Sequence, residues 1–126
     1  MKRSRRSLII LEQEKTIRQS LSNLMEAYQQ FEVFTANTRR EALSLFHGVS
    51  FDRVLCGHWL PDGDGLELLK KFMRQSPRLI SVLMTVHGDD LSRQKAARAG
   101  IRGYLEKTFD LKQLEEAIGW GLRPHQ

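Results

Sequence analysis

Short apolar runs alternate with amphipathic stretches five times along the 126-residue chain, at about 25 residues per unit. A unit of this length is too short to form a domain, but it suits one strand followed by one helix. Because the runs are continuous rather than alternating with polar residues, we expect each strand to be covered on both faces. The pattern predicts an α/β fold with three layers, in which a doubly wound, five-stranded parallel sheet of (βα)5 topology lies between helices. The expected strands lie at 8–11, 31–34, 54–56, 79–84 and 104–105.

The stretches between these strands carry apolar residues three and four positions apart, as expected for helices that bury one face. The stretch from Asp90 to Ala99 has the thinnest apolar face, and Gly100 follows it where a helix end favours a left-handed residue. Three start signals combine a short capping side chain with Glu or Gln three residues later. They are Thr38 with Glu41, Asp64 with Glu67, and Asp110 with Gln113.

The net charge of +5 is concentrated at the start of the chain. Lys2, Arg3, Arg5 and Arg6 supply four of these charges, so about +1 is left for residues 7–126. We therefore divide the chain into a basic arm at 1–6, one folded domain at 7–122, and a tail or the start of a linker at 123–126. The arm could attract phosphates, which keeps a nucleic-acid-associated module as an alternative, although binding of nucleic acid by the domain itself is not expected.

Cysteine content and hydropathy indicate the compartment. Cys56 is the single cysteine and cannot form an internal disulfide, and no apolar stretch approaches the roughly 18 residues of a membrane span. We expect a cytoplasmic protein without a membrane partner.

Common enzyme and metal motifs of such sheets are incomplete here. A dinucleotide-binding turn needs three glycines, but Leu68 stands at the third position after Gly63 and Gly65. A calcium loop through Asp62 and Asp64 fails at both ends. We predict no catalytic residues and no enzyme activity.

The chain from about Leu8 to Trp120 resembles the receiver domain of bacterial two-component response regulators, which has a flavodoxin-like fold. The resemblance rests on SLIILEQEKTIRQSL, REALSLF, FDRVLCGHWLPDGDGLELL, SVLMT and AGIRGYLEKTFDLKQLEEAI, which follow one another in the family's order and spacing. It implies phosphoryl transfer to an aspartate at the end of the third strand, in phosphorelay signal transduction. In that chemistry Mg²⁺ is held by this aspartate and by an acidic pair after the first strand, while a hydroxyl residue and a lysine contact the phosphoryl group.

Several of these positions differ in this chain. The acidic pair falls on Glu12 and Gln13, and the phosphoacceptor position falls on Gly57, which has no side chain to phosphorylate. Thr85 and Lys107 match the hydroxyl and lysine positions. We therefore predict a degenerate pseudo-receiver that is not phosphorylated there, whose Mg²⁺ binding is lost or weak, and which needs no cofactor.

Three further expectations concern the retained residues. Tyr104 matches the aromatic residue that changes rotamer on activation, and we expect it to be half-buried with its hydroxyl in water. Lys107 is expected to pair with Glu12, the nearest strong anion. Thr108 replaces the family's cis proline, so we expect a trans bond between Lys107 and Thr108.

The resemblance implies a signalling module that acts by protein–protein interaction, with another signalling protein or an output domain as its partner. A functional receiver phosphorylated at a non-standard site is a second alternative. The family's usual interface, formed by the fourth helix, fifth strand and fifth helix, could also support a homodimer. On this chain that face would carry Arg93, Arg98, Arg102, Lys112, Glu115 and Glu116.

Overall fold

A computed structural model describes residues 5–118, and its centre is a five-stranded parallel sheet with the order β2-β1-β3-β6-β7. The predicted fold class is confirmed, and each predicted strand overlaps an observed one. The strands of the sheet are β1 (Arg6–Leu11), β2 (Phe31–Ala36), β3 (Arg53–Gly57), β6 (Ile80–Thr85) and β7 (Gly103–Glu106). The helices in the described residues are α1 (Lys15–Ala27), α2 (Arg39–Gly48), α3 (Gly65–Gln75), α4 (Asp90–Arg98) and α5 (Leu111–Ile118).

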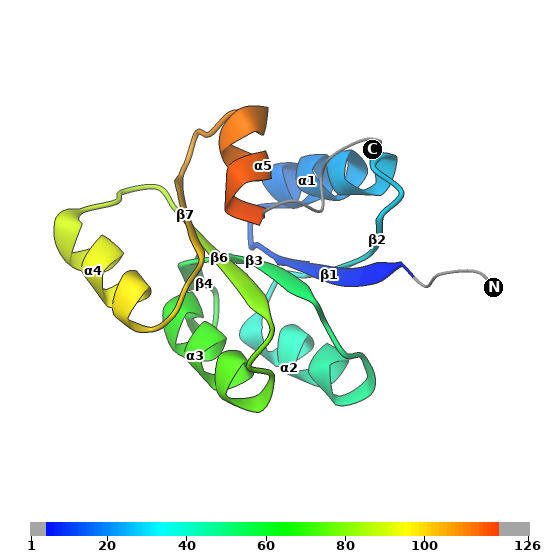
Figure 1. Cartoon of the computed structure of the whole chain (residues 1–126), viewed down its shortest axis with the longest axis horizontal. Coiled ribbons are helices and arrows are strands. Elements are labelled where there is room, and N and C mark those ends of the chain that lie inside the picture. The colour runs from blue at the N-terminus through cyan, green and yellow to red at the C-terminus, as the bar shows by residue number, and fades with distance from the viewer. Residues whose placement is uncertain (1–4, 119–126) are drawn as a thin grey trace.

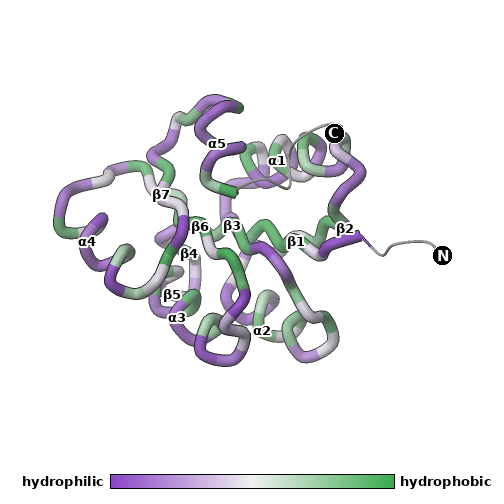
Figure 2. The backbone as a smooth tube through the Cα atoms, in the orientation of Figure 1, coloured by the Kyte–Doolittle hydropathy of each residue, from purple (hydrophilic) through white to green (hydrophobic). Residues whose placement is uncertain are grey.

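Helices cover both faces of the sheet (Figure 1). Alternate residues of each strand point to opposite faces, so Leu8 and Leu55 pack with α1 and α5, whereas Ile9 and Val54 pack with the α2–α4 side. The apolar stretches concentrate along the strands, where Figure 2 shows β1, β3 and β6 as largely hydrophobic segments. This two-sided burial is the reason that the strands appear in the sequence as continuous apolar runs.

The predicted helix starts are confirmed by hydrogen bonds. The Thr38 hydroxyl accepts from the Glu41 amide at 3.1 Å, and the Asp64 carboxylate accepts from the Leu66 amide at 2.8 Å. Asp110 and Gln113 cap each other reciprocally, at 2.8 and 2.9 Å. These side chains satisfy amides that the first turn of a helix leaves without partners.

The weakest predicted helix, α4, has a defined start and end. Its first turn is capped by Asp89, whose carboxylate accepts from the Ser92 amide at 2.8 Å. Gly100, with φ of 91°, takes the left-handed conformation after its end, as predicted. Ala96 is its one buried residue, so α4 has few apolar contacts with the rest of the domain.

A short hairpin after β3 was not predicted. It consists of β4 (Trp59–Leu60) and β5 (Gly63–Asp64), which pair antiparallel. At its turn, the Asp62 carboxylate accepts from the amides of Arg39 and Arg40, at 2.8 and 3.0 Å. The hairpin is therefore tied to the start of α2, far away in the sequence.

The ends of the chain bear on the predicted boundaries. Arg6, counted with the basic arm from the sequence, is the first residue of β1 and aligns with Phe31 of β2. Lys2 and Arg3 of the arm, together with the tail at 123–126, lie outside the described residues. Within residues 5–118, no helix has both the length and the apolar character needed to cross a bilayer.

Candidate functional site

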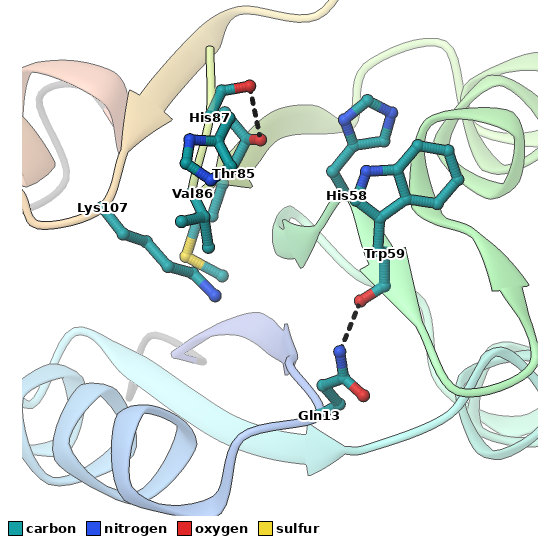
Figure 3. A pocket seen from close by; sticks show the side chains of 8 residues that line it. Gln13, His58, Trp59, Thr85, Val86, His87 and Lys107 are labelled. Atoms are coloured by element: carbon teal, nitrogen blue, oxygen red, sulfur yellow. Dashed lines mark hydrogen bonds between the residues drawn. The ribbon is translucent and has the colours of Figure 1, made fainter.

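The candidate site lies at the carboxyl edge of the sheet, where β1, β3, β6 and β7 end close together. A cavity of about 130 Å³ opens there (Figure 3). The structure brings five of the predicted positions to this edge, because parallel strands all end on the same side. The cavity is lined by Gln13, His58, Trp59, Met84, Thr85, Val86, His87 and Lys107, with Glu12 and Gly57 directly beside it.

Glu12 is buried at the centre of this edge, with 1% of the residue exposed. Its Oε1 accepts from the Lys107 ammonium at 3.0 Å, which confirms the predicted pair. Its Oε2 accepts from the Glu14 amide at 3.0 Å. Both carboxylate oxygens are thus engaged within the protein, and the burial makes this an ion pair with little screening by water.

Gly57 ends β3 directly beside this carboxylate. A Cβ atom built on Gly57 would lie 2.9 Å from Glu12 Oε1 and 3.6 Å from the Leu11 carbonyl oxygen. The distance to Leu11 is an ordinary contact, but real Cβ atoms essentially never come within 3.0 Å of another atom, so a side chain here would have to displace the end of the Glu12 side chain. The Glu12 carboxylate thus occupies the space that a side chain at position 57 would need.

The remaining acidic-pair position carries an amide that already has a structural role. Gln13 Nε2 donates to the Trp59 carbonyl at 3.1 Å, which links the loop after β1 to β4 (Figure 3). The three positions that hold carboxylates in the family pattern therefore contribute Glu12, an exposed amide and a glycine.

Thr85 and Lys107 are joined through the backbone. The Lys107 amide donates to the Thr85 carbonyl at 2.7 Å, and the buried Thr85 hydroxyl donates to the His87 carbonyl at 3.4 Å. The bond between Lys107 and Thr108 is cis, so the predicted trans bond was wrong. The prediction considered only the local preference of the peptide bond, whereas Lys107 is positioned by contacts to two other strand ends.

Tyr104 is half-buried, as predicted, but its hydroxyl is not in water. The phenol oxygen is buried and makes no hydrogen bond within residues 5–118, so that part of the prediction was wrong. The Arg93 guanidinium of α4 lies 4.7 Å from the centre of the ring and covers it. Glu106 holds Arg93 there at 2.6 Å and also accepts from the Gly88 amide at 3.1 Å.

The predicted interaction face on α4, β7 and α5 carries less free charge than expected. Arg93 is paired with Glu106, and Glu115 accepts from the Tyr28 hydroxyl at 3.0 Å. Loss of hydration and this carboxylate raise the pKa of Tyr28. The four predicted residues that are exposed without a hydrogen bond or ion pair from their side chains in the described part are Arg98, Arg102, Lys112 and Glu116.

Three residues near the site were not singled out by sequence reasoning as a group. Trp59 stacks on His58 with ring centres 4.5 Å apart, and 62% of Trp59 is exposed. Cys56, the residue before Gly57 in β3, is completely buried, and this burial raises the pKa of its thiol. The sequence signal that could have drawn attention to Trp59 is a tryptophan in the loop just after a predicted strand.

Comparison with known proteins matches residues 8–119 to the model of the response regulator receiver domain. The match covers nearly the whole domain. The chain belongs to the response regulator receiver domain family. Receiver domains are signalling modules that act through other signalling proteins or output domains, and no catalytic activity is indicated for them.

The individual relatives agree with this assignment. The chain is 35% identical over 107 residues to the regulatory protein AtoC of Escherichia coli, covering 85% of this chain and 23% of AtoC. It is 29% identical to the response regulator protein PilR of Pseudomonas aeruginosa, covering 95% of this chain and 27% of PilR. The receiver thus spans about a quarter of the length of these two relatives. Among solved structures, a CheY-like receiver domain protein from Methanospirillum hungatei superimposes with a TM-score of 0.83 at 26% identity, covering 91% of each chain.

Proposed function

We propose that this receiver domain transmits signals by protein–protein interaction without being phosphorylated on an aspartate. The observation that carries the proposal is the position of Glu12, whose buried carboxylate binds Lys107 and occupies the space beside Gly57. A phosphoacceptor must present a nucleophilic side chain to the phosphoryl donor, and Gly57 has none. The lysine that would contact a phosphoryl group is instead neutralised inside the domain.

The same residues do not fit a Mg²⁺ ion. Magnesium requires near-octahedral coordination by oxygen, usually with one or two carboxylates. Glu12 is the one carboxylate among the three family positions, and both of its oxygens already accept hydrogen bonds. Binding Mg²⁺ would require Glu12 to leave Lys107.

The carboxylates of the hairpin that follows β3 are engaged in structural hydrogen bonds, which argues against phosphorylation at these two positions. Asp62 accepts from the two amides at the start of α2, and Asp64 caps α3. These amides lower the pKa of Asp62 against the opposing effect of its partial desolvation. Each carboxylate would have to give up these bonds before it could attack a donor.

The partner in this proposal is another signalling protein or an output domain. AtoC and PilR are named as regulatory proteins several times longer than this chain, which supports a partner domain of the same kind. A homodimer through α4, β7 and α5 is a further possibility of the proposal, with Arg102, Lys112 and Glu116 as its free charges. The single buried cysteine supports a place in the reducing cytoplasm.

Incubation with acetyl phosphate and Mg²⁺, followed by intact mass spectrometry, tests the proposal. We expect an unchanged mass, while a receiver that retains the acceptor aspartate, treated in parallel, gains about 80 Da for one phosphoryl group. An adduct of that mass on this chain, removed by hydroxylamine as an acyl phosphate would be, contradicts the proposal.

A further inference from the structure

A second hollow lies between α3 and α4 and shares only the lining residues His58 and Trp59 with the cavity at the carboxyl edge. It is a groove of about 480 Å³ that begins at the hairpin residue Trp59. Figure 1 shows α4 at the outer edge of the domain, next to α3. Its charged and aromatic lining consists of His58, Trp59, Asp64, Glu67, Lys70, Lys95 and Arg98.

The charges in this groove do not balance. Lys70 pairs with Glu67 at 3.1 Å, and the Asp64 carboxylate is bound to amides at the start of α3. Lys95 and Arg98, in the last turn of α4, are exposed and make no ion pair or side-chain hydrogen bond within residues 5–118. The Asp64 carboxylate also lies 3.6 Å from His58 Nε2. The lining cations Lys70, Lys95 and Arg98 outnumber the carboxylates of Asp64 and Glu67, so the net formal charge of the groove is positive.

Trp59 gives the groove an apolar end with a fixed position. The indole is exposed, although its ring stacks on His58. The backbone on both sides is held, since the His58 amide donates to the Met84 carbonyl at 2.8 Å and the Trp59 carbonyl accepts from Gln13. An exposed indole on a rigid backbone loses little entropy on binding, and tryptophan is enriched among the residues that dominate binding energy.

We propose that the α3–α4 groove binds an acidic segment of a partner protein. An aromatic or aliphatic side chain of the segment packs on Trp59, and its carboxylates lie against Lys95 and Arg98. The proposal rests on the proposed function, because a receiver that is not phosphorylated needs a contact surface that does not depend on a phosphoryl group. Arg98, which the sequence assigned to the α4–β7–α5 face, lines this groove instead.

Selection from a displayed library of random 12-residue peptides tests the groove with a defined probe. The whole chain serves as the target. We expect the selected peptides to be acidic and to contain an aromatic or aliphatic residue. In ¹H–¹⁵N spectra, a synthetic peptide of the selected sequence should shift the Trp59 indole N–H and the amides of Lys95 and Arg98.

Two double variants separate the groove from general charge effects. Lys95→Glu with Arg98→Glu should weaken the peptide at least about tenfold, because attraction becomes repulsion. Arg102→Glu with Lys112→Glu makes the same change of charge on the α4–β7–α5 face and should change affinity less than about twofold. Trp59→Ala should weaken binding with the charges intact.

Selected peptides without an acidic excess would overturn the proposal. Equal losses of peptide affinity in the two double variants, or spectral shifts at residues far from Trp59, would also overturn it. A library that yields no binding peptide would also count against it. A phosphoryl adduct in the acetyl phosphate experiment would contradict the proposed function, but it would leave the peptide affinities and the spectral shifts unchanged. Failure of the proposed function can therefore be told apart from failure of the groove proposal.

Discussion

In the proposed assignment of site positions, the two sides of the carboxyl-edge pocket depart from the receiver family pattern to different extents. On the side built by β1 and β3, one acidic position has become Gln13 and the acceptor position has become Gly57. On the side built by β6 and β7, Thr85, Tyr104 and Lys107 keep the family's residue types. Under the proposed function, the residues that contact a phosphoryl group in the family pattern persist here for a structural reason.

That reason is the burial of Lys107, of whose side chain 15% is exposed. A cation in such a place needs an anion, and Glu12 supplies it from the altered side. The absence of a side chain at Gly57 leaves room for the Glu12 carboxylate, since a Cβ there would lie 2.9 Å from Glu12 Oε1.

The largest expected effect comes from breaking the pair between the two sides. Lys107→Met should lower the free energy of unfolding by about 3 kcal/mol, because Glu12 is left as a buried, unpaired carboxylate. Urea denaturation measures the change. The control Lys112→Met, at an exposed position of α5, should stay within about 0.5 kcal/mol of the wild type. A similar, small loss in both variants would show that the pair does not hold the two sides together.

The next effect tests whether Glu12 fills the space beside Gly57. Gly57→Ala should cost about 2 kcal/mol through overpacking, and much less in a Glu12→Ser background, where the carboxylate is absent. Gly48→Ala is the matched control, because a Cβ at Gly48 meets nothing within 4 Å, and it should be neutral or slightly stabilising. Additive costs of Gly57→Ala and Glu12→Ser would contradict the account.

A smaller effect concerns the hairpin that follows the altered side. Asp62→Asn should cost about 1 kcal/mol at neutral pH, since it weakens the bonds to the amides of Arg39 and Arg40. Because the folded pKa of Asp62 is lowered, its contribution is present above the ordinary pKa of about 4 and is lost as the pH falls through the folded value. The difference between wild type and variant, measured by urea denaturation, should therefore shrink below about pH 4. A difference in unfolding free energy between wild type and Asp62→Asn that stays constant with pH would contradict this role of Asp62. An equal loss in the control variant Glu116→Gln would contradict it as well.

The smallest effect is expected on the retained side. Tyr104→Phe removes a buried hydroxyl that has no hydrogen bond within the described residues, so stability should change by less than about 0.5 kcal/mol. Tyr28→Phe loses the bond to Glu115 and should cost more, about 1 kcal/mol. Thermal unfolding of the two variants provides the comparison, and a larger loss for Tyr104→Phe would reveal a partner for its hydroxyl.

Those parts of the molecule that depend on local pattern could be predicted from the sequence. Continuous apolar runs specify buried parallel strands, and the spacing of Asp110 and Gln113 specifies a reciprocal cap. The pair between Glu12 and Lys107 followed because strand ends of a parallel sheet meet at one edge.

The features that were missed depend on contacts between distant segments. The two-residue strands β4 and β5 are too short to show a period, and their turn is fixed by the amides of α2. The Arg93 guanidinium packs over the Tyr104 ring, and it is held there by Glu106, which is 13 residues away from Arg93 in the sequence. No local signal reports which of the two arginines on α4 makes such a contact.

The central claim is that Glu12 has permanently replaced the phosphoryl group as the partner of Lys107. A ¹H–¹⁵N NMR titration with Mg²⁺ and beryllofluoride, a phosphoryl mimic that binds an acceptor carboxylate, tests this most directly. We predict no saturable shifts at the amides of Gly57, Thr85 and Lys107. Saturable shifts at these three positions would contradict the claim, because they would show that the pocket still accepts a phosphoryl-like group.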